Sequence, residues 1–143
     1  MSRRTPWVGL LFLTTACASA GSTSPGAASP AGQSAPIARS LLDHYDLPDA
    51  PGWESRLYLI EYAPGVSAPL HHHPVEGLGY VLSGTFESKF EDEAAPTTMH
   101  AGQAFRERVT VPHVLFRNVS QTEPLRFVLA FVVQKDAPVL ETP

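Results

Sequence analysis

Apolar and polar residues alternate most regularly in two segments of the second half of the chain. Between residues 85 and 91, Phe86 and Phe90 fall on one side, and hydroxyl or charged residues fall on the other. Between residues 125 and 133, every second residue is apolar: Leu125, Phe127, Leu129, Phe131 and Val133. A period of two is the pattern of a strand that buries one face. Both segments are therefore predicted to be strands with an apolar inner face.

Short runs rich in β-branched and aromatic residues recur along the chain from residue 56. The expected strands are 56–62, 79–82, 85–90, 97–100, 103–107, 113–117 and 125–134. Turn signals such as Pro64-Gly65 and Ser83-Gly84 separate them, at a spacing typical of a sandwich or barrel. The pattern predicts an all-β, single-domain β-barrel. Residues 41–51 add either one helical turn or an edge strand, and the pattern does not decide between them.

Composition narrows the classes of protein further. The chain has 143 residues, with 10 Lys+Arg against 14 Asp+Glu and a net charge of −4, which makes nucleic acid an unexpected partner. The 14 prolines and 10 glycines disfavour long helices. One cysteine excludes a disulfide framework and zinc sites of the Cys₄ or Cys₂His₂ kind, whereas six histidines allow an imidazole metal site.

The N-terminus has the pattern of an export signal. Arg3 and Arg4 precede an apolar run at 7–16, and Ala18-Ser19-Ala20 offers a small-x-small cleavage site. The run is much shorter than the ~20 residues of a membrane-spanning helix. We expect a signal peptide over residues 1–20 and an exported protein, located in the periplasm or attached to the bacterial envelope.

Cys17 stands where the apolar run ends. The segment 13–17, Leu-Thr-Thr-Ala-Cys, resembles a bacterial lipobox, in which the cysteine becomes the lipid-modified first residue of the mature protein. The resemblance implies a lipoprotein anchored through Cys17. The alternative is that Cys17 is removed with the signal.

The remaining boundaries follow from composition. Residues 21–39 are mostly Ser, Gly, Ala, Pro and Thr, and we expect them to form a flexible tether. Residues 40–137 are long enough for one small β-barrel domain. Residues 138–143 are expected to be a tail.

The histidines carry the candidate chemistry. His71 and His73 are two apart, so on an extended segment their imidazoles share one face and His72 points away. His113 lies between the apolar alternate positions Val111 and Leu115, which places it in the interior. Three such imidazoles can hold a divalent ion and leave a position open. The alternatives are a solvated His-His-His patch and a hydrogen-bonded core histidine.

The surroundings of these histidines resemble the two sequence motifs of the cupin superfamily, over residues 55–133. The matching residues are Gly65, His71, His73 and Gly79–Gly84, then Gly102, Glu107, Pro112, His113 and Asn118. The resemblance implies a cupin-type jelly-roll β-barrel with a metal near its mouth. It also implies that His71, His73 and His113 bind this metal, a divalent Fe, Cu, Mn, Zn or Ni ion.

The carboxylate of the cupin motif is displaced. The position that usually carries the ligand glutamate is Gly77, and Glu76 stands one residue away. A slip by one residue turns a side chain to the opposite face of a strand, although a bulge at Pro74-Val75 would bring Glu76 back as a ligand. Glu76 is therefore either a metal ligand or a solvated outward carboxylate.

Glu107 is the second carboxylate to consider. It precedes His113 by six residues, in a run where Ala104 and Phe105 are apolar. Facing inward, it would serve as a fourth ligand, as a hydrogen-bond partner of a ligand, or as a catalytic general base. The alternative is a surface charge paired with one of three basic residues, Arg106, Arg108 or Arg56.

Two classes of function agree with these features. One is a metal-dependent, dioxygenase-like enzyme acting on a small organic molecule, because a three-histidine site with open positions suits Fe(II) or Cu(II). The other is a non-enzymatic cupin of the cell envelope that binds or senses a small ligand or a metal. Both classes of protein bind a small molecule. The sequence agrees with either a monomer or a homodimer.

Overall fold

The computed structural model describes residues 36–143. The expected signal peptide at 1–20, Cys17 and most of the expected tether lie outside the described residues. No helix within residues 36–143 has the length and hydropathy needed to cross a membrane.

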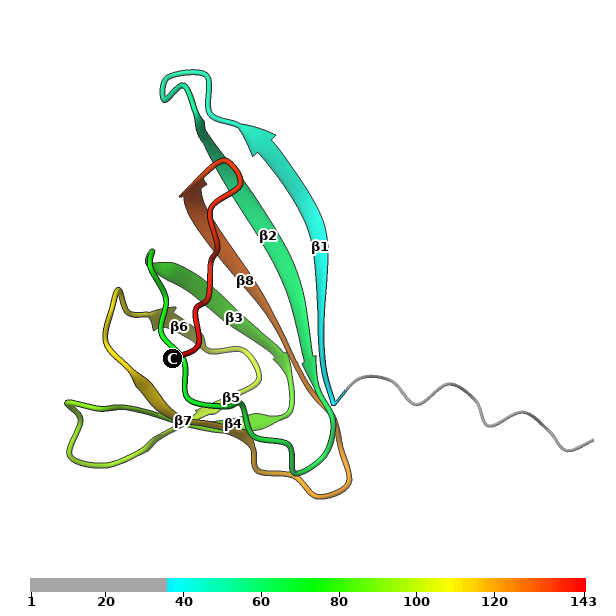
Figure 1. The fold of residues 1–143 in the computed structure, drawn as a ribbon. Helices are drawn as coiled ribbons and strands as arrows, with labels where there is room; N and C mark the ends of the chain where they lie inside the picture. The colour runs from blue at the N-terminus through cyan, green and yellow to red at the C-terminus, as the bar shows by residue number, and fades with distance from the viewer. Residues whose placement is uncertain (1–35) are drawn as a thin grey trace, which may run out of the picture. The chain divides into compact units, whose positions relative to one another are not determined.

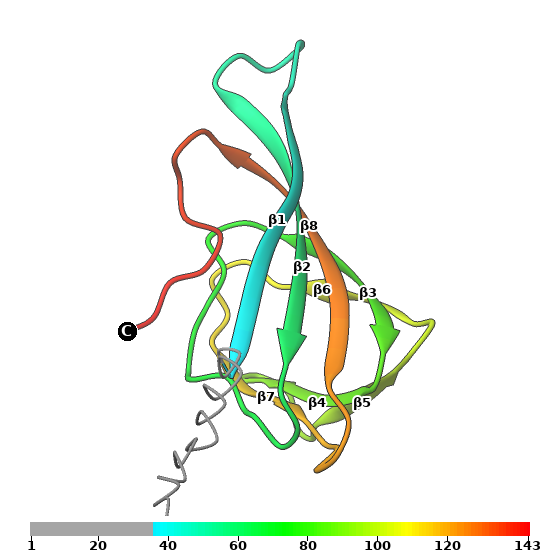
Figure 2. The same cartoon turned by 90° about the vertical axis from the view of Figure 1, so that its right-hand side faces the viewer.

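The described chain folds into eight strands in two antiparallel sheets (Figure 1). The strands are β1 (Ile37–Asp46), β2 (Trp53–Tyr62), β3 (Gly77–Ser83), β4 (Thr85–Phe90), β5 (Thr97–His100), β6 (Ala104–Glu107), β7 (His113–Asn118) and β8 (Leu125–Gln134). One sheet has the order β1-β2-β8-β3-β6 and the other has the order β5-β4-β7. The smaller sheet packs across one end of the larger (Figure 2). This architecture confirms the predicted all-β, single-domain jelly roll.

Residues 41–46 belong to the edge strand β1, and residues 48–51 form a turn between β1 and β2. β1 pairs only with β2, with an irregularity between Leu41 and Asp43. Edge position explains why the pattern was ambiguous, since β1 is exposed along most of its length and needs no apolar alternation. β1 begins at Ile37, so regular structure starts three residues before the expected domain boundary at residue 40.

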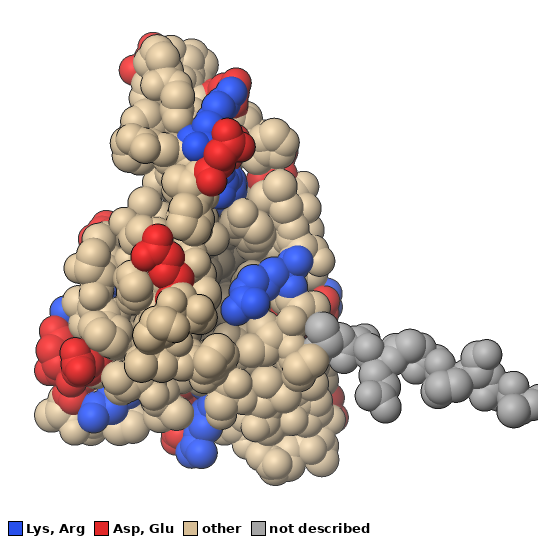
Figure 3. Space-filling model, in the orientation of Figure 1, with Lys and Arg blue, Asp and Glu red and all other residues tan. Residues whose placement is uncertain are grey.

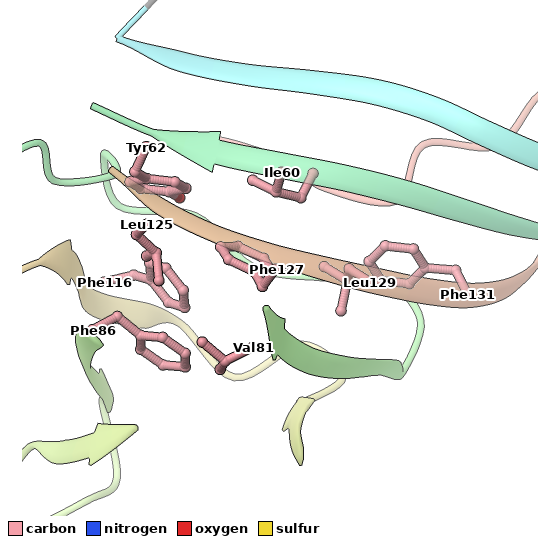
Figure 4. Close-up of a cluster of buried hydrophobic side chains, with 9 residues drawn as sticks. All are labelled: Ile60, Tyr62, Val81, Phe86, Phe116, Leu125, Phe127, Leu129 and Phe131. Carbon is pink, nitrogen blue, oxygen red and sulfur yellow. The ribbon is translucent and has the colours of Figure 1, made fainter. Parts of the chain in front are cut away.

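The apolar faces of the two regularly alternating segments, now β4 and β8, form much of the core. All five odd-numbered residues of β8 are buried, as the alternation predicts, and so are Phe86 and Phe90. The main cluster is Ile60, Tyr62, Val81, Phe86, Phe116, Leu125, Phe127, Leu129 and Phe131 (Figure 4). Within it Phe86 stacks on Phe116 with ring centroids 4.4 Å apart. At the edge of this cluster, the His73 ring stacks on Phe131 with ring centroids 5.7 Å apart.

Charged side chains are dispersed on the face drawn in Figure 3, singly or beside a partner of opposite sign. Among residues 36–143, four arginines pair with carboxylates, for example Arg108 with Asp92 and Arg126 with Glu61. That face therefore presents no broad cationic surface.

Candidate metal centre

The three histidines singled out by the sequence meet inside the barrel. His71 and His73 lie in the segment between β2 and β3, and His113 begins β7. Their exposed fractions are 5%, 3% and 2%, and one ring nitrogen of each lies within 4.8 Å of the others. His72 points away, with its Nε2 2.9 Å from Glu141 Oε2. The prediction that His71 and His73 share a face and that His113 is interior is confirmed.

Backbone hydrogen bonds set the positions of the ligand-bearing segments. The His113 N–H donates to the carbonyl of His71 at 2.7 Å, and the Thr110 N–H donates to the carbonyl of His73 at 2.8 Å. Because His71 and His73 occupy alternate positions of this extended segment, both rings turn to the same side. Isolated β-bridges thus hold this part of the β2–β3 connection beside His113 and Val109.

In each imidazole, one ring nitrogen faces the other histidines and the other, outer nitrogen contacts a neighbouring group. For His71 and His73 the partner of the outer nitrogen shows which nitrogen carries the hydrogen. His71 Nδ1 lies 2.8 Å from the carbonyl oxygen of Pro69, and His73 Nδ1 lies 2.7 Å from that of Val139. A carbonyl oxygen only accepts, so both Nδ1 atoms carry the hydrogen and both Nε2 atoms keep a lone pair. His113 is reversed, since its Nε2 lies 2.7 Å from Ser88 Oγ and its Nδ1 faces inward.

Glu107, at the end of β6, is buried beside two of these histidines, His73 and His113. Its exposed fraction is 3%, and its Oε2 is 3.3 Å from His113 Nδ1 and 3.5 Å from His73 Nε2. The alternative of a surface charge paired with arginine is wrong. Arg108 pairs with Asp92, and Arg56 pairs with Glu54.

Glu76 is left outside. It is exposed, while Gly77 is buried and faces the interior, directly opposite Glu107 in the β3–β6 ladder. A Cβ atom at Gly77 would lie 2.7 Å from Phe131 Cε1 and 3.2 Å from Glu107 Cβ. The inward bulge that would carry Glu76 to the histidines does not form, and the alternative of an outward, exposed carboxylate holds. The neighbouring strand supplies the buried carboxylate instead.

Three buried polar atoms of this group have no hydrogen-bond partner among residues 36–143: His73 Nε2, Glu107 Oε2 and His113 Nδ1. Such atoms are costly unless something satisfies them. Donor atoms about 2.0–2.2 Å from one tetrahedral ion lie about 3.3–3.6 Å apart. The 3.3 and 3.5 Å separations fit that requirement. This donor set therefore suits a borderline divalent cation.

The electrostatics favour the protonation states that bind metal. Burial lowers the pKa of His71 and of His73, which favours the neutral imidazole. Burial raises the pKa of Glu107, but the histidines lower it, and the net pKa lies below its ordinary value. Two neutral imidazoles and an ionised carboxylate are the forms that ligate a metal.

A small cavity of about 60 Å³, open to solvent on one side, adjoins the histidines. Its walls are mostly core residues, including Phe127, Leu129 and Phe131 of β8 (Figure 4). Val139 and Leu140 complete the wall, from the segment 138–143 that the sequence analysis treats as a tail. The cavity can take a small, largely apolar molecule beside the candidate metal.

Sequence reasoning missed three contributors to this site. Ser88 and the Val139 carbonyl hold outer ring nitrogens, and a backbone carbonyl leaves no trace in a sequence pattern. Arg39 lines the cavity, although it falls in the expected tether. The sequence signal that could have found it is the alternation of Arg39 with the apolar residues Ile37 and Leu41, which places the three on one face of a strand.

A family model described as Cupin domain matches residues 58–132. No curated protein matches the sequence significantly.

Several solved structures share the fold. A protein with a double-stranded β-helix domain from Klebsiella pneumoniae is 22% identical with a TM-score of 0.55, and the match covers 73% of this chain and 82% of that one. KdgF from Halomonas sp. is 22% identical with a TM-score of 0.53, covering 71% and 83%. DMSP lyase DddQ from Ruegeria pomeroyi is 20% identical with a TM-score of 0.52, covering 61% of this chain but only 42% of the lyase. Identities this low establish similarity of fold.

Proposed function

Because this chain belongs to the Cupin domain family, we propose that it is an exported metal-binding protein that acts on a small organic molecule. Its site would hold one divalent transition metal through His71, His73, His113 and Glu107. The observation that carries this proposal is the group of three buried histidines whose ring nitrogens lie within 4.8 Å of one another, with the buried, unpartnered Glu107 Oε2 3.3 and 3.5 Å from two of them.

A dioxygenase-like activity is the first form of the proposal. Bound there, a redox-active metal would supply a Lewis-acidic centre for organic substrate and O₂. The chain's own residues supply the rest. Hydrogen bonds to Pro69, Val139 and Ser88 orient the three rings, and β8 lines the cavity with apolar side chains. Glu107 offsets part of the metal charge.

A non-enzymatic binder or sensor is the second form, and one observation favours it. The buried polar residues within 36–143 are the three histidines, Glu107 and Asn118. If Glu107 serves as a ligand, that buried set contains no second carboxylate to move protons. A protein that only captures a metal or small ligand needs none.

Metal content measured on untagged protein tests the site. Wild type should hold about one divalent ion per chain, and His73→Ala and Glu107→Gln should each lower occupancy strongly. His100→Ala is the matched control, because His100 is exposed and its ring lies 3.2 Å from Thr85 Oγ1, away from the centre. Equal metal content in wild type and His73→Ala would refute the site. O₂ uptake against small phenols, diketones and thiols then separates the enzyme from the binder.

Export is tested separately from the metal. Labelled palmitate should enter wild type and be absent from Cys17→Ser if Cys17 is acylated. A mature protein that keeps Met1 would refute export.

A further inference from the structure

Arg39 is the single arginine or lysine in the wall of the cavity beside the histidines, among the residues that the structure describes. It lies on the edge strand β1 and is paired with Ile60, a buried residue that also lines the cavity. The register therefore places Arg39 on the face of β1 that carries the cavity, beside the mouth.

Arg39 has no carboxylate partner within residues 36–143, unlike the four arginines that form ion pairs with Glu54, Asp92, Glu87 and Glu61. The one carboxylate in the cavity wall is Glu107, which lies with the histidines. The positive charge of Arg39 is therefore not paired with a carboxylate within residues 36–143, and it acts on the groups that line the cavity. Burial raises the pKa of the Tyr62 phenol in the cavity wall, and the charge of Arg39 acts in the opposite direction.

The remaining wall limits the kind of anion. It consists mainly of aromatic and aliphatic side chains such as Ile60, Phe116 and Leu129. A guanidinium pairs bidentately with a carboxylate or a phosphate, but a dianion would leave one charge unpaired here, because the described part of the wall holds a single cation and also the carboxylate of Glu107. An anionic head with a compact apolar body therefore complements this cavity better than a polyanion or a sugar.

We propose that Arg39 recognises the carboxylate of a small organic acid bound in this cavity, so that the ligand of the protein is a small carboxylic acid. This inference rests on the proposed function for the role of the ligand, but the contact with Arg39 itself does not require a metal. Arg39 is a specificity residue, since its side chain would contact the non-reacting end of the ligand.

Titration with isobutyrate and its neutral isostere isobutyramide tests the proposal. Binding is followed by chemical-shift changes in the metal-free and zinc-loaded protein. Wild type should bind isobutyrate more tightly than isobutyramide, and Arg39→Gln should weaken isobutyrate binding about tenfold while leaving isobutyramide unchanged. Arg39→Lys should fall between them. Arg126→Gln is the matched control, because Arg126 is a half-exposed arginine of the same sheet that pairs with Glu61 and is absent from the cavity wall.

The outcomes separate this proposal from the proposed function. Equal isobutyrate affinity in wild type and Arg39→Gln overturns the role of Arg39, as does tighter binding of inorganic phosphate than of isobutyrate. Protein that holds zinc but binds no isobutyrate overturns this inference alone. Protein that holds no zinc overturns the metal site, and the metal-free titration still decides the role of Arg39.

Discussion

At each histidine of the candidate metal centre, the partner of the outer ring nitrogen decides which nitrogen faces inward. The carbonyl oxygens of Pro69 and Val139 accept hydrogen bonds from Nδ1 of His71 and His73. The hydroxyl of Ser88 is hydrogen-bonded to Nε2 of His113. Such partners fix the orientation of a ligand ring and its basicity. The donor set is therefore prepared by groups that never touch the metal.

Loss of the Ser88 hydroxyl should weaken metal binding. We expect Ser88→Ala to lower zinc affinity by about tenfold, because the His113 ring loses the group that orients it. Competition with a chromophoric chelator measures the change. Ser40→Ala, at an exposed position of β1, should match wild type, and an unchanged affinity in Ser88→Ala would show that packing against Phe90 orients the ring instead.

Gly77 and Glu107 share one space in the interior. They are opposite each other on adjacent strands, and a Cβ atom at Gly77 would crowd Phe131 and Glu107. The absence of a side chain on β3 thus makes room for the carboxylate from β6.

A side chain at Gly77 should destabilise the fold. We expect Gly77→Ala to lower the free energy of unfolding by about 1–3 kcal/mol through overpacking. Urea unfolding measures it. The neighbouring Leu78→Ala, on the exposed face, should stay within about 0.5 kcal/mol of wild type. Wild-type stability in Gly77→Ala would mean that the Phe131 ring moves aside freely.

Among the elements, the C-terminal segment 138–143 ties the rim of the cavity to the metal centre. His72 and Glu141 exchange two backbone hydrogen bonds of 2.9 and 3.0 Å, and the Val139 carbonyl accepts from His73. Val139 and Leu140 also line the cavity. The segment lies as a strap across the site.

Removal of the strap should loosen the site while the barrel survives. A chain ending after Pro138 loses the acceptor for His73 Nδ1, so we expect zinc affinity to fall by about tenfold. A chain ending after Glu141 keeps Val139, Leu140 and the pairing with His72, and it should bind zinc like wild type. Circular dichroism checks that both chains keep their strands. Equal affinity in the two chains would contradict a role for the strap.

At the scale of the whole molecule, the candidate donors come from both sheets. Glu107 belongs to the five-stranded sheet and His113 to the three-stranded sheet, while His71 and His73 lie on the connection between β2 and β3. An ion bound by all four would link these parts directly.

Metal should therefore stabilise the fold as a unit. With free zinc at about one hundred times its Kd, binding to the native state contributes about 2.7 kcal/mol, which corresponds to a rise in Tm of about 10–20 °C for a domain of this size. Calorimetry with zinc and then with excess chelator measures the rise and its reversal. The double variant His71→Ala/His73→Ala should show no rise. A rise of the same size in that variant would place the zinc elsewhere.

The sequence alone determined the all-β class, the strands at 85–90 and 125–134, and the three inward histidines. These follow from local rules, because alternation along one extended segment decides which residues share a face. The tertiary structure decided what depends on neighbours far along the chain. It placed Glu107 and not Glu76 among the histidines, since only strand pairing puts β6 opposite Gly77. It also brought Arg39 and the strap to the cavity, because a side chain or carbonyl at an edge or terminus acquires a role only from what the fold sets beside it.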